Sequence, residues 1–334
     1  MKLRKWTRFG QIIALLLLLL IIAAVLSLRF GAVNTPLREI LAELSGGEPL
    51  VLKYRLPRLI IAVLTGINMA VAGAILQSVT RNPLAAPDIV GVTAGGGFGA
   101  VVVLLVFPTW SAAGLPIAAF AGAVTAAVIV YLFAYQRGGI RPTRLALTGV
   151  SVSLGFHSLI TFLIVKYALD SSQALVWLKG SLYARSWQHV EMLWPWTLGG
   201  VLLALLSHRQ INTLQLDEDT VTGLGLRIQL VRVLLLLTAV GLSASSVAVS
   251  GTIGFVGLVI PPLSKWLVGP DSRLYLPVSA LLGALLVTLA DLLGRVVLPP
   301  LEIPAGIFTA LIGVPYFIYL LLIRRAQPNK SQSR

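Results

Sequence analysis

The sequence has few charged residues and no cysteine. Asp, Glu, Lys and Arg make up 11% of its 334 residues, whereas 57% are hydrophobic and the mean hydropathy is +0.91. A soluble domain carries about 25% charged residues, so a water-soluble enzyme is excluded. Intrinsic disorder is excluded as well, because disordered chains are poor in apolar residues. The lack of cysteine rules out disulfides and thiolate metal sites.

Motifs for phosphate or metal binding are also missing. The sequence contains no G-x-x-x-x-G-K-[ST] motif to cradle ATP phosphates and no H-E-x-x-H motif to bind zinc. The histidines, His157, His189 and His208, are too far apart for metal-ligand spacing. The glycine-rich stretch 95–99 does not follow a strand, so we interpret it as a helix-packing segment. We therefore expect no catalytic residue, no metal site and no cofactor bound by this chain.

Long apolar runs dominate what is present. Crossing a hydrocarbon core takes about 20 apolar residues, and most of the runs are that long. The expected fold class is an all-α polytopic membrane protein, with residues 1–334 forming a single transmembrane domain. The run at 252–268 contains two prolines, so we expect it to be kinked or re-entrant. The predicted spans are residues 9–28, 59–79, 89–107, 112–135, 145–165, 190–206, 231–249, 252–268, 274–293 and 304–323.

The charged residues predict how these spans are oriented. If the N-terminus lies inside and ten spans alternate, most of the 26 Lys and Arg residues fall in inside loops or tails. This agrees with the excess of positive charge in cytoplasmic loops, so both termini are predicted to be cytoplasmic. The net charge of +14 is then explained by membrane topology, and the expected partner is the lipid bilayer, not nucleic acid.

Ionisable residues within the spans are scarce. Asp291 lies inside one span, about one turn from Arg295, and His157 lies inside another. We interpret Asp291 as an ion-pair partner or a helix cap, and His157 as a packing residue. The other possibility is that they relay ions, as buried ionisable groups do in ion-coupled carriers. A chain that spans the membrane repeatedly without an energy source of its own is expected to depend on a partner.

Four segments resemble the FecCD-type permeases, which are membrane subunits of binding-protein-dependent ABC importers for iron–siderophore complexes, haem and cobalamin. They are R-L-P-R at 55–58, N-P-L-A-A-P-D-I-V-G-V at 82–92, G-T-I-G-F-V-G-L-V-I-P at 251–261 and E-I-P-A-G at 302–306. The sequence departs from the family after Ile260, because Pro261-Pro262 and Lys265 stand where the family often has Pro-His and a following Arg.

The resemblance implies a type II ABC importer permease with ten transmembrane helices per subunit, in a bacterial cytoplasmic membrane. Two permease subunits, either a homodimer or a pair with a sister permease, would enclose one pathway. Cytoplasmic ABC ATPase subunits would use the ATP, and an extracytoplasmic substrate-binding protein would deliver a ferric siderophore. A cobalamin or haem importer is the alternative within this class, and an ion-coupled secondary transporter is the alternative from another class.

The resemblance also assigns roles to individual residues. The docking residues for the binding protein would be Arg55, Arg58 and Arg295. The gate would involve Asn82, Leu84 and Thr143. The coupling surface for the ATPase would lie in the cytoplasmic loop 207–230, for which a helical hairpin is expected, and would include Leu216, Asp217, Glu218, Thr220, Gly223, Leu224 and Gly225.

Overall fold

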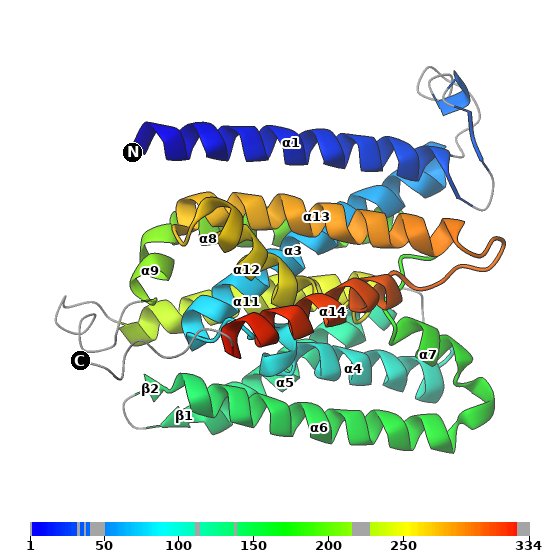
Figure 1. Ribbon diagram of the computed structural model, residues 1–334. Coiled ribbons are helices and arrows are strands. Elements are labelled where there is room, and N and C mark those ends of the chain that lie inside the picture. The colour runs from blue at the N-terminus through cyan, green and yellow to red at the C-terminus, as the bar shows by residue number, and fades with distance from the viewer. Residues whose placement is uncertain are drawn as a thin grey trace.

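The computed structural model is almost entirely helical, with the long helices side by side (Figure 1). It describes residues 2–31, 34–36, 38–40, 51–110, 114–136, 139–215 and 228–325. Each of the ten apolar runs overlaps one helix of this part of the chain. These helices are α1 (Lys2–Arg29), α3 (Leu56–Thr80), α4 (Val92–Val106), α5 (Gly114–Ala134), α6 (Pro142–Lys166), α8 (Trp187–Leu206), α11 (Ile228–Ser250), α12 (Val256–Val268), α13 (Ser272–Val296) and α14 (Ala305–Arg325).

The helices differ in whether they are long enough to cross a bilayer. Seven are long and apolar enough, and α4, α12 and α14 have shorter apolar stretches. At 1.5 Å per residue, the 13 residues of α12 extend about 20 Å, less than the ~30 Å of a hydrocarbon core. The residues before α12 are not helical, and its N-cap Phe255 has a left-handed backbone with φ of 67°. The run at 252–268 is therefore a short helix with an irregular entry.

Short elements lie at the two ends of the bundle. The strands β1 (Tyr135–Gln136) and β2 (Gly139–Ile140) pair antiparallel between α5 and α6. This hairpin and α9 (His208–Thr213) lie at the same end as the N-terminus of α1, whereas α7 (Ser172–Trp177) lies at the other (Figure 1). The remaining short elements are the π-helix η1 (Val51–Arg55) and the 3-10 helices η2 (Pro87–Val90) and η3 (Ala168–Asp170). By the predicted topology, the end with the hairpin is cytoplasmic.

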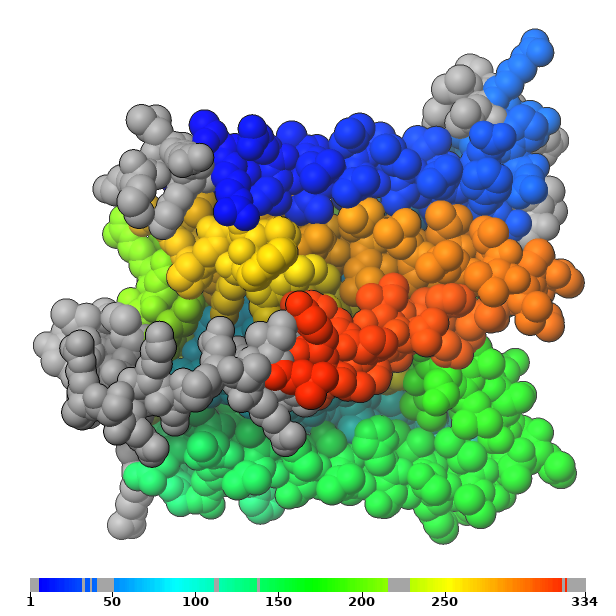
Figure 2. Space-filling view, viewed as in Figure 1, coloured from blue at the N-terminus to red at the C-terminus, as the bar shows by residue number. Residues whose placement is uncertain are grey.

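Helix α3 is the centre of the bundle and packs against α13, α11, α12 and α8. In the most apolar 18-residue stretch of α3, 78% of the residues are buried, whereas in that of α1 only 17% are. Helices α3 and α13 cross closely where Gly66 meets Gly283, because a Cβ on Gly66 would lie 2.2 Å from the Gly283 carbonyl oxygen. Helix α1 lies along α13 at the edge of the molecule (Figure 2), with large apolar side chains exposed.

Candidate functional site

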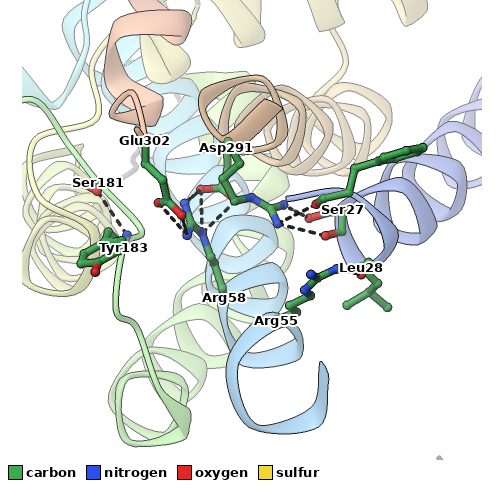
Figure 3. Close-up of polar contacts among 10 residues, drawn as sticks. Ser27, Leu28, Arg55, Arg58, Ser181, Tyr183, Asp291 and Glu302 are labelled. Carbon is green, nitrogen blue, oxygen red and sulfur yellow. Dashed lines mark hydrogen bonds and ion pairs between the residues drawn. The ribbon is translucent and has the colours of Figure 1, made fainter. Parts of the chain in front are cut away.

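A cluster of arginines and carboxylates lies at the predicted external end of the bundle (Figure 3). Arg58 is in the first turn of α3, where Pro57 suits the start of a helix. Its Nε and Nη2 donate to the Asp291 carboxylate from α13 at 2.8 to 3.1 Å. Its Nη1 donates to both carboxylate oxygens of Glu302, just before α14, at 2.9 and 3.1 Å. Arg58 thus joins three separate segments of the chain.

Arg295 extends this cluster to α1. Its Nε lies 3.1 Å from Asp291 Oδ2, which confirms the predicted Asp291–Arg295 ion pair. Its Nη1 donates to the backbone oxygens of Ser27 at 3.1 Å and Phe30 at 3.0 Å, and its Nη2 donates to Ser27 Oγ at 2.6 Å. Arg55 also bonds to the end of α1, because its Nη1 donates to the backbone oxygens of Leu28 and Arg29. Both side chains satisfy carbonyl groups at the C-terminal end of α1.

The three arginines assigned to docking therefore lie together, but internal partners hold them. The side chains of Arg58 and Arg295 are 14% and 5% exposed, and two carboxylates offset their two charges. An acidic side chain arriving from outside would compete with Asp291 and Glu302 for Arg58. The docking role stays a prediction. Among the residues that the structure describes, no three His, Asp or Glu side chains gather as a metal site requires.

Beside this cluster is a pocket that the sequence analysis missed. It encloses about 650 Å³ and is lined by Lys53, Tyr54, Arg58 and residues 183–188. Arg185 lines this pocket, and within the described part of the chain it forms no hydrogen bond or ion pair. Burial and the charge of Arg58 lower the pKa of Arg185 to about 10, so it is still protonated at neutral pH. The signal in the sequence was Y-A-R-S-W at 183–187, an arginine among aromatic residues in an outer loop.

The predicted gate residues lie at the opposite end of the bundle. Asn82 Oδ1 accepts a hydrogen bond from the Leu84 N–H at 2.9 Å, which stabilises the turn after α3. Ser153 of α6 donates to the Asp88 backbone oxygen at 3.1 Å, so α6 contacts the same connection. Thr143 is exposed in the first turn of α6, three residues after the β1–β2 hairpin. Within the described residues, no hydrogen bond joins Thr143 to this turn.

All seven residues assigned to ATPase coupling lie outside the described residues, which end at Gln215 and resume at Ile228. The segments on either side show how this region is attached to the bundle. On the N-terminal side, the backbone oxygen of Leu214 accepts a hydrogen bond from Arg81 Nε at 2.9 Å. Arg81 immediately precedes the predicted gate residue Asn82. Asn212 of α9 also bonds to Asp271 and to the Ser272 N–H, both at 2.9 Å, which fixes α9 to the start of α13.

The C-terminal flank is joined to the β1–β2 hairpin. Gln229 Oε1 accepts a hydrogen bond from the Ile140 N–H, and Arg232 Nη1 donates to the Ile140 carbonyl, both at 3.0 Å. Arg232 is 1% exposed. A Cβ on Gly139, which has φ of 109°, would lie 2.0 Å from the Gln229 side chain. The residues that flank segment 216–227 are therefore bonded to the chain beside the predicted gate residues, near Asn82 on one side and near Thr143 on the other.

The chain is similar in sequence to known proteins over nearly its whole length. A Fe(3+)-citrate import system permease protein of Bacillus subtilis, YfmE, is 42% identical over 322 residues, covering 95% of this chain and 96% of the relative. The Escherichia coli Fe(3+) dicitrate transport system permease protein FecD is 39% identical, covering 90% of this chain and 95% of FecD. The B. subtilis iron(3+)-hydroxamate import system permease protein FhuG is also 39% identical, with 93% and 96% covered.

A solved structure assigned to the metal-chelate type ABC transporters, in an inward-facing conformation, has the same fold. It matches with a TM-score of 0.83 and 32% sequence identity, covering 94% of this chain and 99% of the other. The fold of a type II ABC importer permease is thus confirmed. The model of the FecCD transport family matches residues 18–323. The chain belongs to the FecCD transport family.

Proposed function

We propose that this chain is the permease subunit of an ABC importer that carries ferric siderophores, or a related ferric chelate such as ferric citrate, across a bacterial cytoplasmic membrane. The observation that carries the proposal is the family match over residues 18–323, together with relatives named as permeases for ferric citrate and ferric hydroxamates. The chain contains no phosphate-binding loop of its own, so a separate ATPase subunit would supply the energy.

Helix α6 supports the pairing of two permease subunits. It exposes Ser151, His157, Ser158 and Thr161 within an otherwise apolar span. Polar side chains within a membrane seldom face lipid and instead face other helices or a water-filled path. We propose that this side of α6 faces the pathway shared with a second permease subunit, either a copy of this chain or a sister chain.

Coupling to the ATPase is proposed to act through the loop 207–230. When the ATPase closes on ATP, it would displace this loop. Hydrogen bonds on both flanks would transmit that displacement. The bond between Arg81 and the Leu214 carbonyl would carry it to the turn at Asn82. The bonds of Gln229 and Arg232 to Ile140 would carry it to the start of α6. The pathway would then alternate between outward and inward openings.

Uptake by cells tests the proposal. A strain lacking this chain is given radiolabelled ferric siderophore, ferric citrate, haem and cobalamin, with and without an intact ATPase. We expect uptake of a ferric chelate to be lost in the deletion strain, and to be restored by this chain only when the ATPase is active. Restored uptake of haem or cobalamin instead would identify the alternative cargo.

The competing class predicts a different result. An ion-coupled carrier would transport without an ATPase and would stop when the proton gradient collapses, and it would depend on Asp291 or His157. The Asp291 carboxylate is held by Arg58 and Arg295, an arrangement that suits a structural ion pair better than a proton relay. ATPase-independent uptake that collapses with the gradient would overturn the proposal.

A further inference from the structure

We propose that the pocket around Arg185, on the predicted external end, binds a carboxylate group. The Arg185 pocket comprises Lys53, Tyr54, Arg58, Tyr183, Ala184, Arg185, Ser186, Trp187 and Gln188. The inference rests on the proposed function only in placing this pocket on the outer face, where cargo arrives. It concerns a different arginine from the three that the family resemblance assigns to docking.

The charges of the pocket are the first observation. Arg185, Arg58 and Lys53 line it, and among the residues that the structure describes no Asp or Glu does. Arg58 is neutralised by Asp291 and Glu302, which lie behind it in the cluster. Arg185 has no such partner among the described residues, and its Nε is buried there without a hydrogen bond. A buried donor without a partner is costly, and a carboxylate would bind this half-buried guanidinium with two parallel hydrogen bonds.

Hydrogen bonds fix the backbone that forms the walls of the pocket. The Trp187 ring donates from Nε1 to the Leu52 carbonyl at 2.9 Å, which joins the start of α8 to η1. Ser186 and His189 form a capping box at the same helix start. Tyr54 and Tyr183 are more than half exposed at the rim. The volume of about 650 Å³ falls within the range of small-molecule sites, which combine aromatic walls with a few polar groups.

A carboxylate could reach this pocket from two sources. A chelate such as ferric citrate carries carboxylates of its own, and a docked binding protein can present an acidic side chain. Both would make the same charge-assisted hydrogen bonds to Arg185. The chemistry of the site is therefore common to both, and the experiment separates them.

The first arm uses citrate as the probe, on the permease–ATPase complex in nanodiscs without binding protein. Calorimetric titration measures its affinity for the natural complex and for Arg185→Gln. We expect the substitution to weaken binding about tenfold or more, with Arg185→Lys in between. Arg29→Gln is the matched control, because it removes an exposed external cation whose side chain does not line the pocket. This result would identify a free carboxylate ligand.

The second arm measures association of the binding protein that supports uptake with the same complexes. If the carboxylate belongs to that protein, citrate does not bind, and Arg185→Gln weakens association about tenfold while Arg29→Gln leaves it unchanged. Within the described part of the chain Arg185 has no polar partner, so its replacement breaks no hydrogen bond or ion pair there and the variant is expected to fold. Lys53→Gln, at an exposed position of the same pocket, provides a second variant.

The proposal is overturned if both Arg185→Gln and Lys53→Gln match the natural complex in both arms. Cellular uptake keeps this failure apart from failure of the proposed function. A complex that imports a ferric chelate but shows no effect in either arm disproves the carboxylate site alone. A complex that imports no ferric chelate disproves the proposed function.

Discussion

At the scale of single residues, Arg58 joins distant parts of the chain at the predicted outer end of the bundle. It bonds to Asp291 and Glu302, which are 233 and 244 positions away in the sequence. Removing one partner of a buried ion pair leaves the other charges uncompensated, which costs about 3–5 kcal/mol. Arg58 therefore has a structural role whether or not a partner also binds it.

We predict that Arg58→Gln lowers the thermal unfolding temperature of the purified complex. Arg295 alone would then offset the charges of Asp291 and Glu302, and the free energy of unfolding is expected to fall by about 3–5 kcal/mol. Unfolding monitored by intrinsic fluorescence measures the shift, with Arg29→Gln as the control. A variant that keeps its stability and loses only stimulation by the binding protein would show instead that Arg58 acts in docking alone.

Asp271 offers a second residue-scale prediction. It caps α13 by accepting from the Arg273 N–H. Burial pushes its pKa up, but hydrogen bonds from Asn212 and Arg273 and the charges of Arg273 and His208 outweigh this, so the net pKa is lowered. Because the folded pKa is lowered, the charged form stabilises the fold above the ordinary Asp pKa. That stabilisation is lost as the pH falls through the lowered value.

Two substitutions separate the cap from the charge. Asp271→Ala should cost about 1 kcal/mol, as expected for loss of an N-cap. Asp271→Asn retains capping and removes the charge, so its deficit should be present at about pH 7 and should shrink as the pH falls from about 4 through the lowered pKa of Asp271. Unfolding curves across this pH range measure this. A deficit for Asp271→Asn that is unchanged by acid would contradict the assigned role of the charge.

Some of this residue-scale chemistry could be predicted from the sequence, and some could not. The spacing of Asp291 and Arg295 by one helical turn predicted their ion pair. The partners of Arg58 could not be predicted, because they depend on how α3, α13 and the start of α14 come together. Arg185 was missed because an arginine among aromatic residues in a loop is not specific to a site, and a charge without a partner is recognisable only once its neighbours are placed.

At the scale of elements, the flanks of the segment 216–227 are the most informative feature. One flank is bonded to Arg81 beside the turn at Asn82, and the other to Ile140 beside the start of α6. Apolar runs predicted the long helices well, because burial and membrane insertion depend on composition over many residues. The β1–β2 hairpin, α7 and α9 were not predicted, since each is too short to produce a periodic pattern.

We predict that Gln229→Ala uncouples transport from ATP hydrolysis. It removes the bond to the Ile140 N–H, so displacement of the loop reaches the hairpin less completely. Uptake per ATP hydrolysed should fall about tenfold, which corresponds to ~1.4 kcal/mol of coupling. Reconstituted vesicles measure both rates. The matched control is Gln210→Ala on α9, an exposed glutamine whose side chain forms no hydrogen bond within the described residues. Equal effects of the two substitutions would contradict the relay.

At the scale of the whole molecule, the sidedness of the bundle was predicted from the charged loops and is open to a direct test. The chain has no cysteine, so a single introduced cysteine gives an unambiguous label. Thr109, exposed between α4 and α5, is predicted to be external, and Arg209, exposed on α9, is predicted to be cytoplasmic.

We expect a membrane-impermeant maleimide to label Thr109→Cys in intact cells and to label Arg209→Cys only after the membrane is permeabilised. The positive-inside distribution of Lys and Arg is the physical reason. Labelling detected on gels measures the outcome. Labelling of Arg209→Cys in intact cells would mean that the predicted orientation is wrong.

The buried pairing of Arg58 also determines how the outer face responds to ionic strength. Mobile ions screen exposed charges over about 8–10 Å in physiological salt, but they hardly reach a pair whose Asp291 carboxylate is 2% exposed. The ion-pair cluster therefore keeps its strength in concentrated salt. Arg185 is open to the pocket and has no counter-charge among the described residues, so concentrated salt weakens its attraction for anions. Two neighbouring arginines thus differ in their sensitivity to the ionic strength at the predicted outer face.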